Sequence, residues 1–249
     1  MHIIERAGQG PTVVCVHGFC QSSAYWVPTL DLLAAQGANA FALDLPGFAG
    51  SAREAGPYTL PAFADAIADL LDRRGLTRIV LLGGSMGGAV AQHFVLRHPD
   101  RVSRLLLVAT GAFTADPATA LARADAIAAA PWNEEAVTPI VAGFFYRPPA
   151  PDQVANYRAI ALRASQAAAI EAARSNATER TFERLDRIAV PTLIVQGRHD
   201  KARTVAHGSE MIARLPAARL AVIEDAGHTP QLEQPDAFHA VALPFLLES

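Results

Sequence analysis

Short apolar runs alternate with longer helical patterns along most of the chain, and this alternation constrains the fold more than any other feature. Several runs are apolar at nearly every position, as strands buried on both faces of a parallel sheet are. The predicted strands cover residues 12–16, 39–45, 78–82, 103–109, 191–197 and 218–224. Strands that alternate with helices predict an α/β fold, a doubly wound, mostly parallel sheet with helices on both faces.

The helical patterns carry recognisable start and stop signals. The pattern over 24–37 ends on Gly37, a residue type that favours the left-handed conformation after a helix. The pattern over 59–75 starts at Thr59 and ends at Gly75, with a proline in its first turn. A last helix is predicted over residues 235–247, which are mostly apolar on one side.

The alternation breaks after the strand at 103–109. Residues 111–187 show no convincing strand pattern and are typical of alanine-rich helices, over 116–131 and 152–180, joined by a stretch rich in proline and aromatic residues. We expect a helical insertion over one end of the sheet, with residues 1–110 and 188–249 forming the core. The alternative is that these helices are simply part of the main domain.

Composition excludes several classes of protein. The chain has 249 residues, 51% of them apolar and 18% charged, with a net charge of −3, which is typical of a globular protein and gives no basic excess for nucleic acid. The first residues lack the features of a signal peptide, and no apolar run is long enough for a membrane span. Cys15 and Cys20 are expected to be free thiols, which predicts a cytoplasmic protein.

The segment "GGSMGG", residues 83–88, contains the pattern G-x-S-x-G centred on Ser85. A buried strand leads into it and a helix leads out. A serine at the apex of such a turn adopts a strained conformation and needs small neighbours, so Ser85 is a candidate nucleophile. The alternative is a glycine turn with an idle serine. Gly84 occupies the variable position, where it either widens the site or relaxes the turn.

A serine nucleophile needs a base, and the base needs an orienting group. His228 follows the last predicted strand, and Asp200 follows the strand at 191–197. Because the carboxyl ends of parallel strands meet at one edge of the sheet, we expect both side chains to lie near Ser85. The chain order Ser85, Asp200, His228 is that of one known arrangement of a catalytic triad.

Rival residues have weaker contexts. Asp44 precedes a Pro-Gly turn, where a carboxylate is expected to bond backbone amides, and His17 is interpreted as a side chain that shapes its loop. No pair of histidines has metal-ligand spacing with a third ligand nearby, so no metal is expected. Acyl transfer also needs donors for an oxyanion, and we assign the backbone amides of Phe19 and Met86 to that role.

Together these segments resemble the α/β-hydrolase fold family, in its small, cofactor-independent serine hydrolase branch. The segments "HGF" at 17–19, "DLPGFAGS" at 44–51, "GGSMGG" at 83–88, "GRHD" at 197–200 and "GHTPQLEQP" at 227–235 match that family in order and spacing. The resemblance implies that the insertion is a lid, or cap, that one N-terminal strand is missing, and that no cofactor is needed. A serine at position 85 argues against the epoxide hydrolase and haloalkane dehalogenase branches, which carry an aspartate there.

Aromatic residues of the insertion, and one beside the loop at 17–19, are candidates for an apolar substrate pocket, although at least half of such aromatic residues are expected to be packing residues. They are Trp26, Trp132, Phe144, Phe145 and Tyr146. The first hypothesis is a hydrolase of a small to medium, largely apolar carboxylic ester or lactone. The second is a carbon–carbon bond hydrolase of ring-cleavage diketones. The third is a regulator that keeps the triad but works by binding a ligand.

Overall fold

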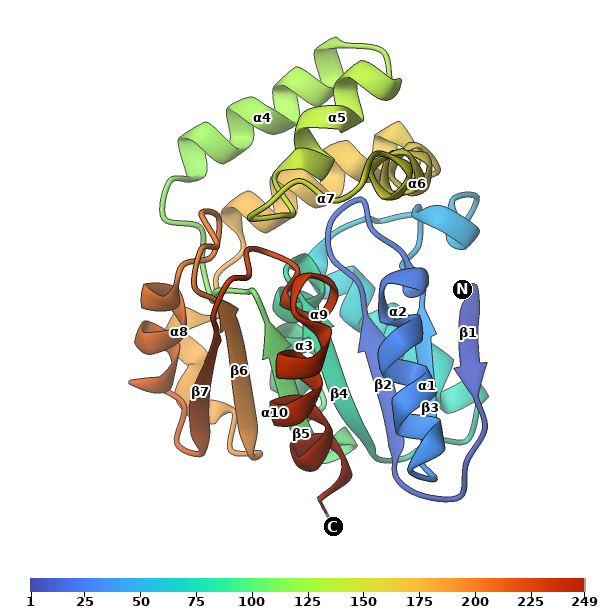
Figure 1. The fold of residues 1–249 in the computed structure, drawn as a ribbon, viewed down its shortest axis with the longest axis vertical. Coiled ribbons are helices and arrows are strands. Elements are labelled where there is room, and N and C mark those ends of the chain that lie inside the picture. The colour runs from blue at the N-terminus through green and yellow to red at the C-terminus, as the bar shows by residue number, and fades with distance from the viewer. Residues whose placement is uncertain (249) are drawn as a thin grey trace.

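Seven strands form one sheet in the computed structural model, which describes residues 1–248 (Figure 1). In spatial order they are β1 (Ile3–Arg6), β3 (Asn39–Leu43), β2 (Thr12–Val16), β4 (Ile79–Gly84), β5 (Val102–Val108), β6 (Thr192–Gly197) and β7 (Ala218–Ile223). All neighbouring pairs are parallel except β1 with β3. The predicted fold class and all six predicted strands are therefore confirmed, and β1 is an additional, antiparallel edge strand.

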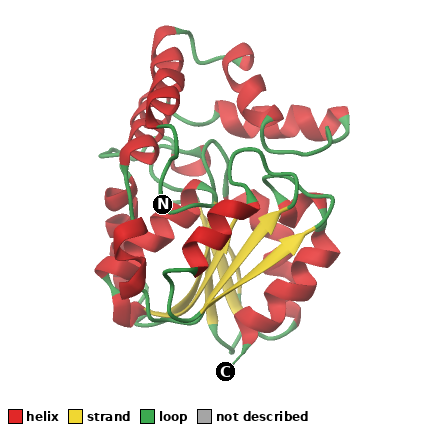
Figure 2. Ribbon diagram, turned by 90° about the vertical axis from the view of Figure 1, so that its left-hand side faces the viewer, coloured by secondary structure: helices red, strands yellow, loops and turns green. Residues whose placement is uncertain are grey.

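Helices cover both faces of the sheet and create two apolar cores (Figure 2). Along β2, Val14 and Val16 face one core while Val13 and Cys15 face the other. The first core is closed by α2 (Leu60–Arg73), α3 (Met86–Arg97) and α8 (Val205–Ile212), and the second by α1 (Val27–Ala35) and α10 (Pro235–Leu247). Burial on both faces explains why these strands are apolar at successive positions.

The predicted helix ends are confirmed at three positions. Thr59 caps α2, since its hydroxyl accepts a hydrogen bond from the amide of Ala62 at 3.3 Å. Gly75 and Gly37, which follow α2 and α1, have positive φ angles of 65° and 85°. Glycine tolerates this backbone conformation without the steric cost that a side chain adds.

Four helices connect β5 to β6 and lie over the carboxyl end of the sheet (Figures 1 and 2). They are α4 (Pro117–Ala129), α5 (Glu134–Ala142), α6 (Pro151–Leu162) and α7 (Gln166–Thr178). The predicted helical pattern over 152–180 is two helices rather than one, because Ser165 caps α7 by accepting from the amide of Ala168. The helix α5, which contains Pro139, was not predicted from the sequence.

One further feature agrees with the sequence. Cys15 and Cys20 are buried and carry free thiols. Within residues 1–248, no helix combines the length and the apolar character that crossing a bilayer requires.

Candidate active site

Ser85 lies at the sharp turn between β4 and α3. Its backbone angles are φ 50° and ψ −118°, a conformation that side chains adopt rarely and at a cost. Its amide donates to the carbonyl of Val108 on β5 at 2.8 Å, which holds the turn against the sheet. The strained turn therefore presents the Ser85 side chain beyond the carboxyl end of β4.

The glycines around Ser85 permit close contacts between backbones. A Cβ atom on Gly83 would lie 2.3 Å from the carbonyl oxygen of Gly87. A Cβ atom on Gly87 would lie 2.5 Å from the carbonyl oxygen of His17. Both distances are shorter than carbon and oxygen atoms tolerate. The turn therefore requires glycine at both positions.

Gly84 makes room for an aromatic side chain of the core. A Cβ atom on Gly84 would lie 2.9 Å from Cζ2 of Trp26, whose indole is fully buried and 6.5 Å from the Phe238 ring between centroids. The space left by the missing side chain is thus filled by the indole. This contact gives a packing reason for glycine at position 84 that the sequence does not reveal.

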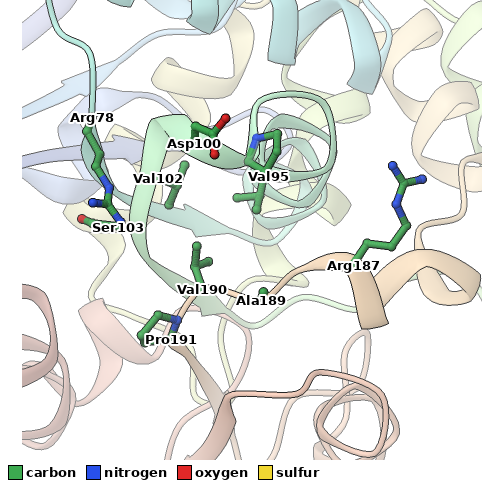
Figure 3. A pocket seen from close by; sticks show the side chains of 10 residues that line it. Arg78, Val95, Asp100, Val102, Ser103, Arg187, Ala189, Val190 and Pro191 are labelled. Carbon is green, nitrogen blue, oxygen red and sulfur yellow. The ribbon is translucent and has the colours of Figure 1, made fainter.

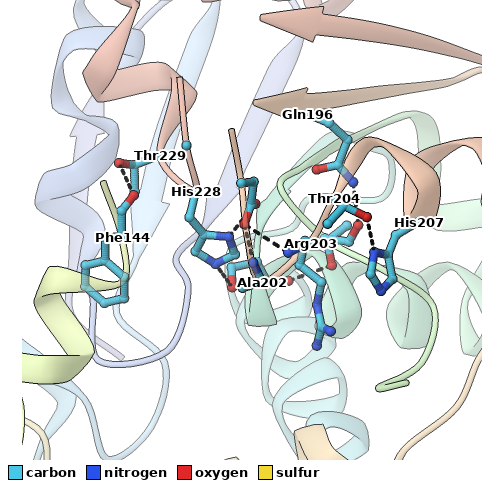
Figure 4. Close-up of polar contacts among 12 residues, drawn as sticks. Phe144, Gln196, Ala202, Arg203, Thr204, His207, His228 and Thr229 are labelled. Atoms are coloured by element: carbon cyan, nitrogen blue, oxygen red, sulfur yellow. Dashed lines mark hydrogen bonds and ion pairs between the residues drawn. The ribbon is translucent and has the colours of Figure 1, made fainter. Parts of the chain in front are cut away.

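His228 lies in the loop between β7 and α9 (Pro230–Glu233), directly before Thr229 (Figure 4). Its Nε2 is 2.7 Å from the Ser85 hydroxyl, and its Nδ1 is 2.7 Å from Oδ2 of Asp200. With an ionised Asp200 as acceptor, Nδ1 carries the proton and Nε2 accepts from the serine hydroxyl. The structure therefore brings the three predicted residues together in one hydrogen-bonded chain.

The Asp200 carboxylate is fully buried in the loop after β6. Its second oxygen, Oδ1, accepts hydrogen bonds from the amides of Ala202 at 2.8 Å and Arg203 at 2.9 Å. Burial of the Arg203 guanidinium lowers the pKa of that side chain, and the negative charge of Asp200 opposes this shift. Two amides and one imidazole thus stabilise the buried carboxylate.

The loop predicted to supply an oxyanion donor passes beside Ser85. A Cβ atom on Gly18 would lie 3.1 Å from Cβ of Ser85, and the Gly18 amide donates to the Gln21 side chain at 2.9 Å. Phe19 follows directly, and Met86 is the first residue of α3, where backbone amides have no partner within the helix. Both assigned amides therefore belong to segments adjacent to the serine.

His17 and Asp44 hold loops together, as the sequence predicted. The Nδ1 of His17 donates to the Gly18 carbonyl at 2.7 Å, and its Nε2 accepts from the Leu45 amide at 3.0 Å. Burial lowers the pKa of His17, so the ring stays neutral. Asp44 accepts from the amides of Ser23 at 2.6 Å and Gly50 at 2.8 Å.

The predicted pocket residues separate into groups. Phe144 and Phe145 belong to an aromatic cluster with Tyr25 and Tyr157, with ring centroids 5.0 to 6.4 Å apart. The Phe144 carbonyl accepts from the Thr229 hydroxyl, next to His228, at 3.0 Å (Figure 4). Tyr157 was not predicted as part of this cluster, because a helical pattern does not show which face of the helix contacts a distant loop.

The remaining predicted pocket residues are not part of this cluster. Trp26 lies in the core beneath Gly84. Tyr146 stacks on His199, with the two rings 3.8 Å apart and nearly parallel. Trp132 is half-buried just before α5 and packs against the core.

A cavity of about 520 Å³ lies at the other end of the sheet (Figure 3). It is lined by Arg78, Ser103 and Pro191, which stand where β4, β5 and β6 begin. Ser85, Asp200 and His228 follow the carboxyl ends of strands, so this cavity is separate from them. Across residues 1–248, no group of three or more His, Cys, Asp or Glu side chains is arranged to hold a metal ion.

Comparisons with known proteins agree with the fold. The family model described as the alpha/beta hydrolase fold matches residues 11–235. A pimeloyl-(acyl-carrier protein) methyl ester esterase of Aeromonas hydrophila is 31% identical over 253 residues, covering 94% of this chain and 95% of that protein. A 2-hydroxy-6-oxo-6-phenylhexa-2,4-dienoate hydrolase of Burkholderia cepacia is 27% identical, covering 98% of this chain and 90% of that protein.

A solved structure extends the agreement to three dimensions. The crystal structure of the enol-lactonase from Burkholderia xenovorans LB400 matches with a TM-score of 0.90 and 25% identity, covering 99% of this chain and 96% of that one. The family match spans nearly the whole sheet, and both similar sequences cover nearly the whole chain. The chain therefore belongs to the family of enzymes with the alpha/beta hydrolase fold.

Proposed function

We propose that the chain is a serine hydrolase that cleaves a carboxylic ester or lactone of a small to medium, largely apolar substrate through an acyl-enzyme. The observation that carries this proposal is the hydrogen-bonded chain from Ser85 through His228 to Asp200 at the end of a strained turn. A serine hydroxyl is a weak nucleophile until a base accepts its proton, and this arrangement supplies one.

In the proposed reaction, Nε2 of His228 takes the Ser85 proton while Oγ attacks the carbonyl carbon of the substrate. The negative oxygen that forms accepts hydrogen bonds from the amides of Phe19 and Met86. His228 then gives its proton to the departing alcohol, and the acyl group stays on Ser85. Water then gives a proton to His228 and attacks the acyl carbon, and His228 returns that proton to the Ser85 oxygen as the acid is released. Asp200 remains ionised and keeps the imidazole in the required tautomer.

Residues 111–187 act as the cap over this centre in our proposal. The aromatic cluster of Phe144, Phe145, Tyr25 and Tyr157 supports an apolar binding surface, because its Phe144 member is bonded to the residue after His228. A surface of this kind selects substrates by shape and apolar area rather than by charge. The expected cytoplasmic location stays a prediction.

Ester turnover tests the proposal directly. We expect hydrolysis of p-nitrophenyl acetate and butyrate, and of a simple lactone, with loss of at least about a thousandfold in kcat for Ser85→Ala. Labelling of Ser85 by a fluorophosphonate, followed by mass spectrometry, identifies the nucleophile independently. Absence of turnover on every acyl ester, together with absence of labelling, would overturn the proposal.

Carbon–carbon bond hydrolysis is the second candidate, favoured by the similarity to the dienoate hydrolase of Burkholderia cepacia. That reaction is followed by the loss of the yellow colour of a ring-cleavage dienoate. Faster turnover of the dienoate than of the esters would favour this candidate. Saturable binding of either compound without turnover would instead favour a regulator.

A further inference from the structure

A second carboxylate is bonded to the loop that carries His228. Glu233 lies at the end of α9, and its Oε1 accepts from the amide of Gly227 at 2.9 Å and from that of Thr229 at 3.1 Å. These two amides belong to the residues on either side of His228. One oxygen atom therefore fixes the backbone both before and after the histidine.

The other oxygen of Glu233 reaches the helices over the sheet. Its Oε2 accepts from the amide of Tyr146, between α5 and α6, at 2.7 Å. The backbones of Gly227 and Tyr146 also lie close together, since a Cβ atom on Gly227 would be 2.6 Å from the Tyr146 nitrogen. The Thr229 hydroxyl donates to the Phe144 carbonyl at 3.0 Å, which adds a second link between the same segments.

The segment around Tyr146 also contacts the loop that carries Asp200. The Tyr146 ring stacks on His199, the residue before Asp200, at 3.8 Å between centroids and 9° between planes. The His199 amide donates to the carbonyl of Ala226 at 2.9 Å, which joins the Asp200 loop to the His228 loop. Three segments that are distant in sequence thus meet around Glu233.

We propose that Glu233 is a positioning residue that fixes the orientation of the His228 imidazole and the placement of residues 144–146 beside it. The proposal rests on the proposed function, in which His228 must make two hydrogen bonds of 2.7 Å at once. Because Nδ1 and Nε2 belong to one rigid ring, a displacement of the backbone weakens both bonds together. A misplacement of about 1 Å can cost on the order of a hundredfold in rate.

The carboxylate suits this role better than its amide analogue does. A carboxylate has two acceptor oxygens, whereas glutamine has one acceptor oxygen and one donor group. With all three backbone partners acting as donors, Glu233→Gln leaves either Tyr146 or the pair Gly227 and Thr229 facing another donor. This substitution therefore changes the bonding with almost no change in side-chain volume.

Steady-state kinetics provide the first test. For Glu233→Gln we expect a fall in kcat of about 10- to 100-fold on p-nitrophenyl butyrate, with KM within about threefold of the wild type. Glu233→Asp keeps the charge and is expected to recover part of the loss. The matched control is Glu224→Gln, since Glu224 is an exposed carboxylate at the end of β7 that pairs with Arg198. An unchanged kcat in Glu233→Gln would overturn the proposal.

Proton NMR measures the hydrogen bond of His228 itself, which a loss of stability alone does not change. The hydrogen bond from Nδ1 of His228 to Asp200 is expected to give a far-downfield resonance in the wild type and in Glu224→Gln. We expect this resonance to shift or broaden in Glu233→Gln while circular dichroism reports an intact fold. An unaltered resonance would contradict the proposal. Should Glu233→Gln not fold, Glu233→Asp becomes the test, and wild-type values of both kcat and the resonance would overturn it.

The two proposals fail in different ways. If the wild type neither turns over esters nor reacts with a fluorophosphonate, the proposed function fails, but the resonance still reports whether Glu233 orients His228. If the wild type is active and Glu233→Gln matches it in both kcat and the resonance, only the positioning role is lost.

Discussion

One oxygen of the Asp200 carboxylate accepts a hydrogen bond from Nδ1 of His228 at 2.7 Å, and the other oxygen accepts hydrogen bonds from two backbone amides. Rotation of the carboxylate would therefore break the hydrogen bonds at both of its oxygens. This relationship separates Asp200 from Asp44, whose two oxygens are both engaged by backbone amides of other loops. Of these two aspartates, Asp200 is the one that is hydrogen-bonded to His228.

We predict that Asp200→Asn lowers kcat by about 10³- to 10⁴-fold, because an amide in this position favours the wrong tautomer of His228. The fold should persist, since asparagine has nearly the same shape, and circular dichroism with thermal unfolding checks this. The comparison variant is Asp44→Asn, for which we expect a lower melting temperature and a much smaller change in kcat. Near-normal rates in Asp200→Asn would mean that another carboxylate orients the base.

We predict that Gly84→Ala lowers the free energy of unfolding by about 1–3 kcal/mol, the usual cost of overpacking a core. The reason is the 2.9 Å contact that its Cβ would make with the Trp26 indole. Without that contact, alanine in a strand would be slightly more stable than glycine. Denaturant unfolding measures the effect.

A double-mutant cycle isolates the contact between these two residues. Trp26→Phe removes the atoms that an alanine at position 84 would meet, so the cost of Gly84→Ala should be smaller in that background. A coupling of about 0.5–3 kcal/mol is expected for residues in contact. Additive changes would show that the indole does not set the requirement for glycine.

We predict that Tyr25→Phe raises the free energy of unfolding by about 1 kcal/mol. Tyr25 is 2% exposed, and among residues 1–248 its hydroxyl has no hydrogen-bond partner. Burial also raises the pKa of this phenol. Removing a buried hydroxyl that lacks a partner removes the cost of its desolvation, while the ring keeps its contacts with Phe144 and Tyr157. Urea unfolding measures the change, and a clear loss of stability would contradict the prediction.

The sequence predicts the parts of this molecule that are set by local pattern or by required chemistry. The buried strands are recognisable because helices cover both faces of the sheet, so that successive residues are apolar. The turn at Ser85 is recognisable because few residue types fit it. The edge strand β1 escapes prediction, since it has four residues of which none is fully buried. The helix α5 escapes because its Pro139 is a residue type that usually breaks helices.

Contacts between distant segments are the part that local pattern cannot supply. Glu233 and Tyr146 are 87 positions apart, and no local sequence pattern around either residue predicts the hydrogen bond between them. The aromatic residues were predicted as one pocket because they are apolar and lie in the insertion or beside the loop at 17–19. The structure divides them, because the Trp26 indole packs in the core against Gly84 and Tyr146 stacks on His199.

Acid stability should depend on a histidine remote from Ser85. His93 on α3 is 4% exposed, and burial, with help from the charges of Arg184 and Arg97, lowers its pKa to about 4. Its Nε2 lies 3.6 Å from Glu179, which is beyond hydrogen-bonding distance. The ring therefore stays neutral in the folded state over a range in which it is protonated in the unfolded state.

The sign of the pH effect follows from proton uptake. Between pH 6.5 and about 4 the unfolded chain binds a proton at His93 that the folded chain does not, so stability falls as the pH falls. Burial lowers the pKa of His17 and of His239 as well, so the wild-type slope has several contributors. We predict that His93→Gln flattens the plot of unfolding free energy against pH in this window and leaves it parallel to the wild type above pH 7. Urea unfolding at a series of pH values measures both slopes, and equal slopes below pH 6 would contradict the prediction.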